Sequence, residues 1–309
     1  MVRYVVKRLL MLIPILLAVS FIVYFIVDLA PADEVDVQYG SELTVEEKDA
    51  IREERGLNDP FIVRYGRYLV KMLQGDLGVS SASGEPVFDL YMEKVPNTLS
   101  LTLVSIVVSL LISIPLGVLA ALKQNSWIDA TCTVIGLAGI SLPCFCTGLV
   151  LILLFSHRLN WLPSFGAEHW YSVILPAMTV GLQNTGLILR TTRSSMLEVI
   201  RADYLRTARA KGVSEKSVIM KHALKNAMIP ILTVIGTNMA VNIGGAVVTE
   251  TVFAWPGVGR MIINGIGQRD TNLVTGFIIM TTMISSVIIL LVDIIYGFVD
   301  PRIKARYTK

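Results

Sequence analysis

Six long stretches without Asp, Glu, Lys, Arg or His constrain the fold of this chain more than any other feature. They cover residues 9–27, 95–122, 130–156, 170–189, 226–249 and 271–292. Each is at least 19 residues long, and a helix needs about 20 apolar residues to cross the hydrocarbon of a bilayer. Charged residues make up only 17% of the chain, which argues against a soluble protein with six buried core helices. We therefore predict an all-α membrane protein with six transmembrane helices.

The distribution of basic residues predicts the orientation of these helices. If the N-terminus lies inside, the inner segments 1–8, 123–129, 191–227 and 293–309 carry sixteen Lys and Arg residues and the short outer loops carry three. Cytoplasmic loops are enriched in Lys and Arg, so both termini are expected to be cytoplasmic. No small-x-small cleavage site follows the first run, so residues 1–29 are expected to be an N-terminal tail and an uncleaved first span.

The first outer segment, residues 30–94, is large enough to form a small extracytoplasmic helical insertion between the first two spans. It holds 14 acidic and seven basic residues, a net charge of −7. Thr44 and Glu47 have the spacing of a capping box for a helix that stops at Gly56. Asp59-Pro60 then predicts the start of a second helix. The apolar face of that helix would carry Phe61, Tyr65, Tyr68, Leu69, Met72 and Leu73.

The inner segment 191–227 is the most polar part of the membrane half of the chain, with eight Lys and Arg residues against three acids. Asp203 can cap a short helix over 204–211 that ends at Gly212. Ser214 can cap a second helix. The apolar face of the second helix would hold Met220, Ala223, Leu224 and Ala227. Two short helices hinged at a glycine favour a docking element over a loop that only fixes topology.

Two spans carry patterns of small or polar residues. The second span repeats small residues at every fourth position, which allows close helix packing against a neighbouring span or a second subunit. These residues are Ser105, Ser109, Ser113 and Gly117. The fifth span contains Asn238 and Asn242 one turn apart, with Glu250 near its outer end. Polar groups in hydrocarbon are costly, so these three line a translocation path, or the asparagines join helices by hydrogen bonds.

Catalytic patterns are missing from the sequence. The three histidines are scattered, and no phosphate-cradling G-x-x-x-x-G-K-[ST], G-x-S-x-G or H-E-x-x-H motif occurs. Cys144 and Cys146 have no further Cys or His beside them, so they are interpreted as small buried hydrophobic residues and not as a metal site. No enzymatic activity and no cofactor are expected of the chain itself. A passive channel and an intramembrane protease are alternatives, but a channel would not need a docking element and a protease would need paired catalytic groups at membrane depth.

Five segments resemble the permease subunits of the dipeptide/oligopeptide/nickel class of bacterial ABC importers, and the resemblance covers essentially the full length. They read VVKRLLMLIPILLAVSFIVY, GLNDPFIVRYGRYLVKMLQGDLG, ADYLRTARAKGVSEKSVIMKHALKNAMIP, TVFAWPGVGR and DIIYGFVDPR. The third is similar to the cytoplasmic coupling loop that engages the ATPases of such importers. Gly212 and Ala208 fit the general Glu-Ala-Ala…Gly pattern, whereas Arg206 and Thr207 replace its Glu and first Ala. The ATPase-coupling residues implied are Asp203, Tyr204, Leu205, Arg206, Thr207, Ala208, Arg209, Ala210, Lys211 and Gly212.

The resemblance also implies an assembly in the bacterial inner (plasma) membrane. Residues 95–309 would form the five-helix permease core and half of a translocation path. The expected partners are a second homologous permease, two cytoplasmic ATPase subunits that bind ATP and Mg²⁺, an extracytoplasmic substrate-binding protein, and membrane lipid; no nucleic acid is expected. The expected cargo is di- or oligopeptides, with a nickel chelate or glutathione as alternatives.

The predicted orientation can be tested with a membrane-impermeant thiol reagent. A cysteine placed at Ser83 should react in intact cells, because the outer insertion faces outward. A cysteine at Ser214 should react only after the cells are opened, because the basic loop faces the cytoplasm. The opposite pattern at either position would reverse the orientation.

Overall fold

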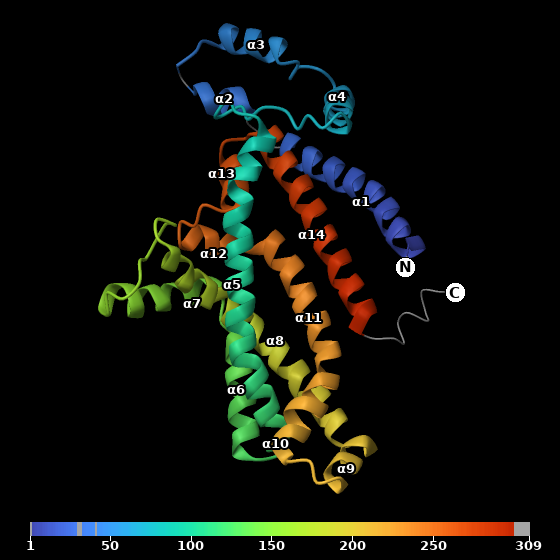
Figure 1. Cartoon of the computed structure of the whole chain (residues 1–309). Helices are drawn as coiled ribbons and strands as arrows, with labels where there is room; N and C mark the ends of the chain where they lie inside the picture. Colours follow the sequence, from blue (N-terminus) through green and yellow to red (C-terminus); the bar gives the residue numbers. More distant parts are fainter. Residues whose placement is uncertain (1, 30–32, 41, 300–309) are drawn as a thin grey trace.

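The computed structural model describes residues 2–29, 33–40 and 42–299, and this part of the chain is helical without strands (Figure 1). Within it, five helical segments are long and apolar enough to cross a membrane. A sixth span results if the bent pair Trp127–Ser141 and Cys144–Arg158 is counted as one. The prediction of an all-α membrane protein is confirmed. The C-terminal tail, predicted to be cytoplasmic, lies outside the described residues.

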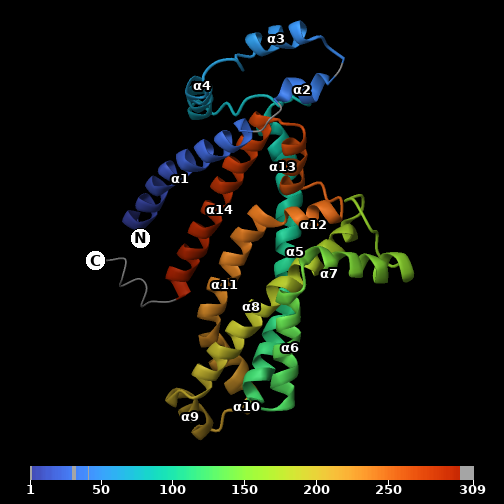
Figure 2. The same cartoon turned by 180° about the vertical axis from the view of Figure 1, so that it is seen from behind.

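The membrane part consists of a few long helices and several short ones. The long helices are α1 (Val2–Asp28), α5 (Val87–Leu122), α8 (Ile174–Ile200), α11 (Leu224–Gly245) and α14 (Thr271–Val299). The shorter elements are α6 (Trp127–Ser141), α7 (Cys144–Leu151), the π-helix η1 (Ile152–Arg158), the 3₁₀-helix η2 (Trp170–Val173), α12 (Val247–Val252) and α13 (Val258–Gly267). Helix α5 runs along the whole bundle, with α6 beside its lower half and α11 and α14 on another side (Figures 1 and 2).

The seam between α5 and α8 is the most extensive contact between two helices of the described chain. A Cβ added at Gly117 of α5 would lie 2.6 Å from Cβ of Thr192 on α8, and one added at Gly181 of α8 would lie 2.9 Å from the Ser105 carbonyl oxygen. Ser105, Ser109 and Ser113 are all buried. Small residues at these positions allow the two backbones to approach, as the four-residue spacing predicted. The partner is a neighbouring span of the same chain.

Helix α6 runs antiparallel to α8 and is fixed to it by an ion pair. Nε and Nη2 of Arg193 donate to the two carboxylate oxygens of Asp129 at 2.6 and 2.7 Å. The Asp129 carboxylate also accepts from the backbone N–H of Asn125, so the turn before α6 is held by the same group. A two-point pair with a third hydrogen bond is the geometry in which a buried charge is compensated.

The outer segment contains α2 (Glu34–Tyr39), α3 (Val45–Glu54) and α4 (Phe61–Leu73), which lie at one end of the bundle (Figures 1 and 2). The capping box of Thr44 and Glu47 is confirmed. Helix α4 packs through Tyr68 against Tyr24 of α1 and Ile279 of α14. Leu73, predicted on the same apolar face, is 73% exposed, because it is turned about 100° about the helix axis from Met72, which packs against this cluster.

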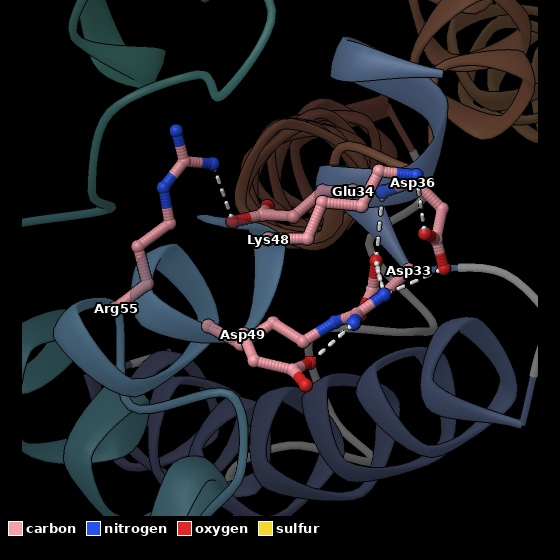
Figure 3. Close-up of polar contacts among 7 residues, drawn as sticks. Asp33, Glu34, Asp36, Lys48, Asp49 and Arg55 are labelled. Carbon is pink, nitrogen blue, oxygen red and sulfur yellow. Dashed lines mark hydrogen bonds and ion pairs between the residues drawn. The ribbon is translucent and has the colours of Figure 1, made fainter. Parts of the chain in front are cut away.

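Arg52 joins α3 to α2 through carboxylates, and Figure 3 labels its partners Asp33, Asp36 and Asp49. Its guanidinium contacts Asp33 at 2.5 Å, Asp36 at 2.7 Å and Asp49 at 2.8 Å. Burial alone would raise the pKa of Asp33, but hydrogen bonds from Arg52 and from the backbone N–H of Asp36 outweigh it and hold the pKa below its ordinary value. A cavity of about 890 Å³ lies between these helices and the turn over residues 78–84.

Two predicted spans are broken in the structure. The third uncharged run splits into α6 and α7, which are bent by 103°. Pro143 precedes α7 and has no backbone N–H to continue the hydrogen-bond ladder of α6. The fifth run ends as a continuous helix at Gly245, and α12 follows as a separate short helix. Proline and glycine residues are the breakers in both cases.

The close approach of α5 and α8 predicts how one methyl group added at the seam changes the stability of the protein. Gly117→Ala should destabilise the protein by about 1–3 kcal/mol, because the new Cβ would overlap Thr192 and the backbone of α8. Gly66→Ala is the matched control, since a Cβ there meets nothing within 4 Å, and it should be neutral or stabilising. Thermal unfolding of the purified protein measures both. Equal melting temperatures for the two variants would show that the seam can relax.

Candidate functional site

The basic inner segment folds into a compact unit between α8 and α11. It comprises α9 (Asp203–Ala210), α10 (Glu215–Ser217) and the π-helix η3 (Val218–Ala223). In Figures 1 and 2 it lies at the end of the bundle opposite to α2, α3 and α4. Gly212 joins the two halves with a φ of +77°, a conformation that favours glycine, so the predicted break between two helices at this glycine is confirmed.

Neither of the two predicted N-cap residues, Asp203 and Ser214, makes a capping hydrogen bond with its side chain. Asp203 is the first residue of α9, the capping position belongs to Ala202, and no side chain caps this end. The Asp203 carboxylate is 95% exposed and contacts Arg206 at 3.6 Å, a distance and exposure that give little stabilisation. Ser214 holds the capping position of α10, but its side chain makes no capping hydrogen bond. Both helices are instead held by packing.

Leu205 anchors α9 to the bundle. Its side chain is fully buried in a cluster with residues of α5, α8 and the following helices. The other buried members are Val118, Ala121, Met196, Val218, Ala223 and Ala227. The prediction for Ala223 and Ala227 is confirmed, whereas Met220 is 52% exposed. The π-helical turn η3 inserts an extra residue per turn, so it rotates the apolar face and brings Val218 inward in place of Met220.

Two polar contacts brace the unit across the hinge. Arg209 donates from Nε and Nη2 to the carboxylate of Glu215 at 3.0 and 2.8 Å. This hydrogen bonding holds the pKa of Glu215 below its ordinary value. Asn226 donates to the Tyr204 hydroxyl oxygen at 2.8 Å. The surface of α9 is therefore presented on a braced support.

The ten predicted coupling residues divide into a buried and an exposed group. Leu205 is buried and Ala208 is half-buried against the same cluster. Arg209 is exposed, and its guanidinium donates a hydrogen bond to the Glu215 carboxylate. The remaining predicted residues offer an exposed surface, which we call the α9 surface. It consists of Asp203, Tyr204, Arg206, Thr207, Ala210, Lys211 and Gly212.

The asparagines of α11 do not share an exposed face. Asn242 is buried, Asn238 is half-buried, and within the described chain the Asn242 Nδ2 atom has no hydrogen-bond partner. The exposed stripe of α11 instead carries Thr233, Thr237 and Val241. The two threonine hydroxyls donate to backbone carbonyls one turn earlier. Each threonine hydroxyl therefore keeps a free acceptor site toward the exposed side.

A small groove beside α11 was not predicted from the sequence; its lining surface is mostly apolar and includes four hydroxyl residues. Its volume is about 270 Å³, and it lies between α11, α13 and α14. Its lining residues are Gly244, Ile262, Ile278, Thr281, Thr282, Ser285 and Ser286. Four hydroxyl side chains within six residues of an otherwise apolar helix are the signal that could have indicated it.

Glu250 lies elsewhere than predicted. Its side chain is fully buried, so in this structure it does not face an outer mouth. One carboxylate oxygen accepts from the Thr98 hydroxyl at 2.7 Å, and the other accepts from the backbone N–H of Arg260 at 2.9 Å. Thr98 in turn accepts from the backbone N–H of Val258 at 2.9 Å. The carboxylate therefore links α12 to α5 and to the start of α13.

The loop between α12 and α13 wraps around this carboxylate. A Cβ added at Gly257 would overlap the Glu250 carboxylate, and one added at Gly259 would overlap Val247 of α12 and lie 3.0 Å from the same carboxylate. Both positions therefore require glycine for close approach. Asn97 braces the loop from α5 through two hydrogen bonds of 3.0 Å. It donates to the Pro256 carbonyl and accepts from the Trp255 indole. The segment TVFAWPGVGR is thus a folded loop built around a buried acid.

Comparisons with known proteins decide the family. Residues 113–305 match the family described as "Binding-protein-dependent transport system inner membrane component". Residues 1–102 match the corresponding N-terminal family. The "Glutathione transport system permease protein GsiC" of Escherichia coli O6:H1 is 39% identical over 306 residues, which cover 99% of this chain and 100% of that protein. This chain is a permease of the peptide/nickel class of ABC importers.

Further relatives agree with this family. The permease is also 39% identical to the GsiC protein of Salmonella paratyphi A, over the same shares of both chains. Among solved structures, an inward-facing form of the MetNI methionine ABC transporter matches with a TM-score of 0.59. The match has 19% identity and covers 69% of the permease and 97% of that chain, so it supports the fold alone. As an importer permease, the chain is an inner membrane protein that works with ATPase and substrate-binding partners.

The environment of Glu250 predicts the result of removing its charge. Glu250→Gln should destabilise the permease by about 1–3 kcal/mol, because an amide NH₂ replaces one of two buried acceptors that face donors. Glu53→Gln on α3 is the matched control, since Glu53 is exposed, and it should change stability by less than about 0.5 kcal/mol. Thermal unfolding of both purified variants is the measurement. Unchanged stability of Glu250→Gln would mean that the carboxylate does not hold the loop.

Proposed function

We propose that the permease forms half of the translocation path of an ATP-driven importer of short peptides, with glutathione among its substrates. A second, homologous permease supplies the other half. ATP and Mg²⁺ are bound and ATP is hydrolysed by two cytoplasmic ATPase subunits, and a substrate-binding protein delivers the cargo from outside. The observation that carries this proposal is the full-length similarity to glutathione permeases.

The α9 surface is proposed as the contact to an ATPase subunit. It is exposed, it carries the cations Arg206 and Lys211, and it rests on the buried Leu205. A braced support of this kind passes a movement of the attached partner to α8 and α11, the helices on either side of α9. This requires α9 to lie on the cytoplasmic side, with α2, α3 and α4 outside, as the distribution of Lys and Arg predicts.

The path is proposed to follow the exposed stripe of α11 and the neighbouring groove. Thr233, Thr237, Asn238 and the groove hydroxyls offer sparse polar contacts along an apolar wall. Such contacts can hold the amide groups of a peptide in passing without binding it tightly. Asn242 belongs to the same region, and its unpartnered amide gives it a reason to face the path when the helices rearrange. Glu250 serves as the support of the loop beside it.

The proposed substrate class rests on chemical groups that glutathione and dipeptides share. Glutathione is a tripeptide with one γ-peptide link, so glutathione and dipeptides both present amides and terminal charges. A nickel chelate lacks these peptide groups. The similarity to glutathione permeases therefore supports short peptides as the proposed substrate class, with glutathione among them.

Reconstitution of the whole importer tests this proposal. Vesicles containing both permeases, the ATPases and the binding protein should accumulate labelled dipeptide or glutathione when ATP is supplied on the ATPase side. Arg206→Glu should reduce uptake and substrate-stimulated ATP hydrolysis at least about tenfold, because reversal of a charge at a docking surface costs more than 1.4 kcal/mol. Arg206→Lys preserves the charge and is the matched control.

Each part of the proposal has its own contrary result. Accumulation of a nickel chelate without uptake of peptide or glutathione would refute the substrate class. Equal activities of Arg206→Glu and Arg206→Lys would refute the role of the α9 surface. Uptake that continues without ATP would indicate a passive channel.

A further inference from the structure

The junction between α6 and α7 leaves a broken backbone uncovered. Ser141, Leu142 and Pro143 are all exposed in the described part of the chain. The last carbonyl groups of α6 and the first N–H groups of α7 have no partners within their own helices, as at every helix end. Pro143 contributes no N–H at all. The Leu142 N–H and the Pro143 carbonyl are paired, but the other helix-end groups of this exposed corner are left to their surroundings.

The depth of the junction in the membrane follows from its neighbours on α8. Gly139 of α6 lies directly against the Leu182 carbonyl, where an added Cβ would overlap. The two helices are antiparallel, so one further turn of α6 brings Leu142 level with Thr179. Thr179 is at the centre of the uncharged run over residues 170–189. The junction thus lies near the middle of the hydrocarbon.

Lipid is a poor cover for a helix break at this depth. Irregular backbone in the hydrocarbon region is tolerated only where protein buries it or where it lines a water-filled cavity, since each unsatisfied group costs several kcal/mol. One of these two surroundings must therefore apply to residues 141–143.

Water is disfavoured by the side chains that continue from the junction. Helix α7 and η1 leave the bundle sideways as an arm, seen in both Figures 1 and 2. The exposed side chains of the arm are apolar from Phe145 to Leu154, and the exposed polar residues His157 and Arg158 follow only at its far end. The exposed apolar side chains include Phe145, Leu149, Val150, Leu153 and Leu154. A surface of this composition is not the wall of an aqueous path, so another protein is the cover that remains.

We infer that the α6–α7 junction and the arm pack against the second permease subunit. This inference rests on the proposed function, which supplies a second membrane-embedded chain. The ATPases and the binding protein lie outside the hydrocarbon and cannot reach the junction. Contact with a second chain would bury the broken backbone of residues 141–143 and the apolar side of α7 together.

Photo-crosslinking in the assembled importer tests the inference. A photoreactive benzoyl-phenylalanine in place of Phe145 or Leu149 should crosslink to the second permease. The matched control is the same residue in place of Leu111, which is 71% exposed on the unbroken helix α5. We expect at least about tenfold more permease–permease product from the arm, identified by mass spectrometry.

The access of water to the α6–α7 junction is tested separately. In a variant with Cys132, Cys144 and Cys146 replaced, Leu142→Cys should react with a charged thiol reagent at least about tenfold more slowly than Ser83→Cys. Equal rates, or crosslinks from the arm to lipid alone while the second permease is present, would overturn the inference and leave the proposed function standing. An active importer without a second permease would overturn both.

Discussion

A chain in hydrocarbon must satisfy its backbone hydrogen bonds without water, and this constraint organises the whole permease. Most of the membrane part meets it with long unbroken helices. Two breaks in the helices, one after α12 and one at Pro143, differ in how their backbone groups are covered. The loop after α12 is closed by the buried Glu250 carboxylate, together with Thr98 and Asn97 of α5. The junction at Pro143 has no such closure in the described chain, and this difference is the basis for assigning it to a subunit contact.

Helix α5 is the common support of these features. Its small residues admit α8. Its residues Asn97 and Thr98 hold the α12–α13 loop, and Val118 and Ala121 pack with the Leu205 anchor of α9. The α9 surface and the α12–α13 loop therefore attach to different parts of the same helix. A rigid element connecting these two parts of the bundle is a physical route for coupling.

The candidate functional residues separate into a group that holds the structure and a group that remains exposed. Leu205, Ala208 and Glu250 are turned inward, whereas Arg206, Thr207, Lys211 and the threonines of α11 remain on the surface. Substitutions of the inward group are expected to change stability together with activity. The exposed group is therefore where contacts to ATPase and substrate can be tested cleanly.

The sequence by itself determined the class of the protein, because run length, basic-loop charge and family motifs do not depend on how the helices turn about their axes. It also determined local features such as the Thr44–Glu47 capping box and the hinge at Gly212. Only the tertiary structure decided which side chains face inward. A π-helical turn exchanged Met220 for Val218, and the approach of Gly257 and Gly259 enclosed Glu250. Pro143 was visible in the sequence, but the 103° bend and the exposure of the junction depend on packing between segments distant in the chain.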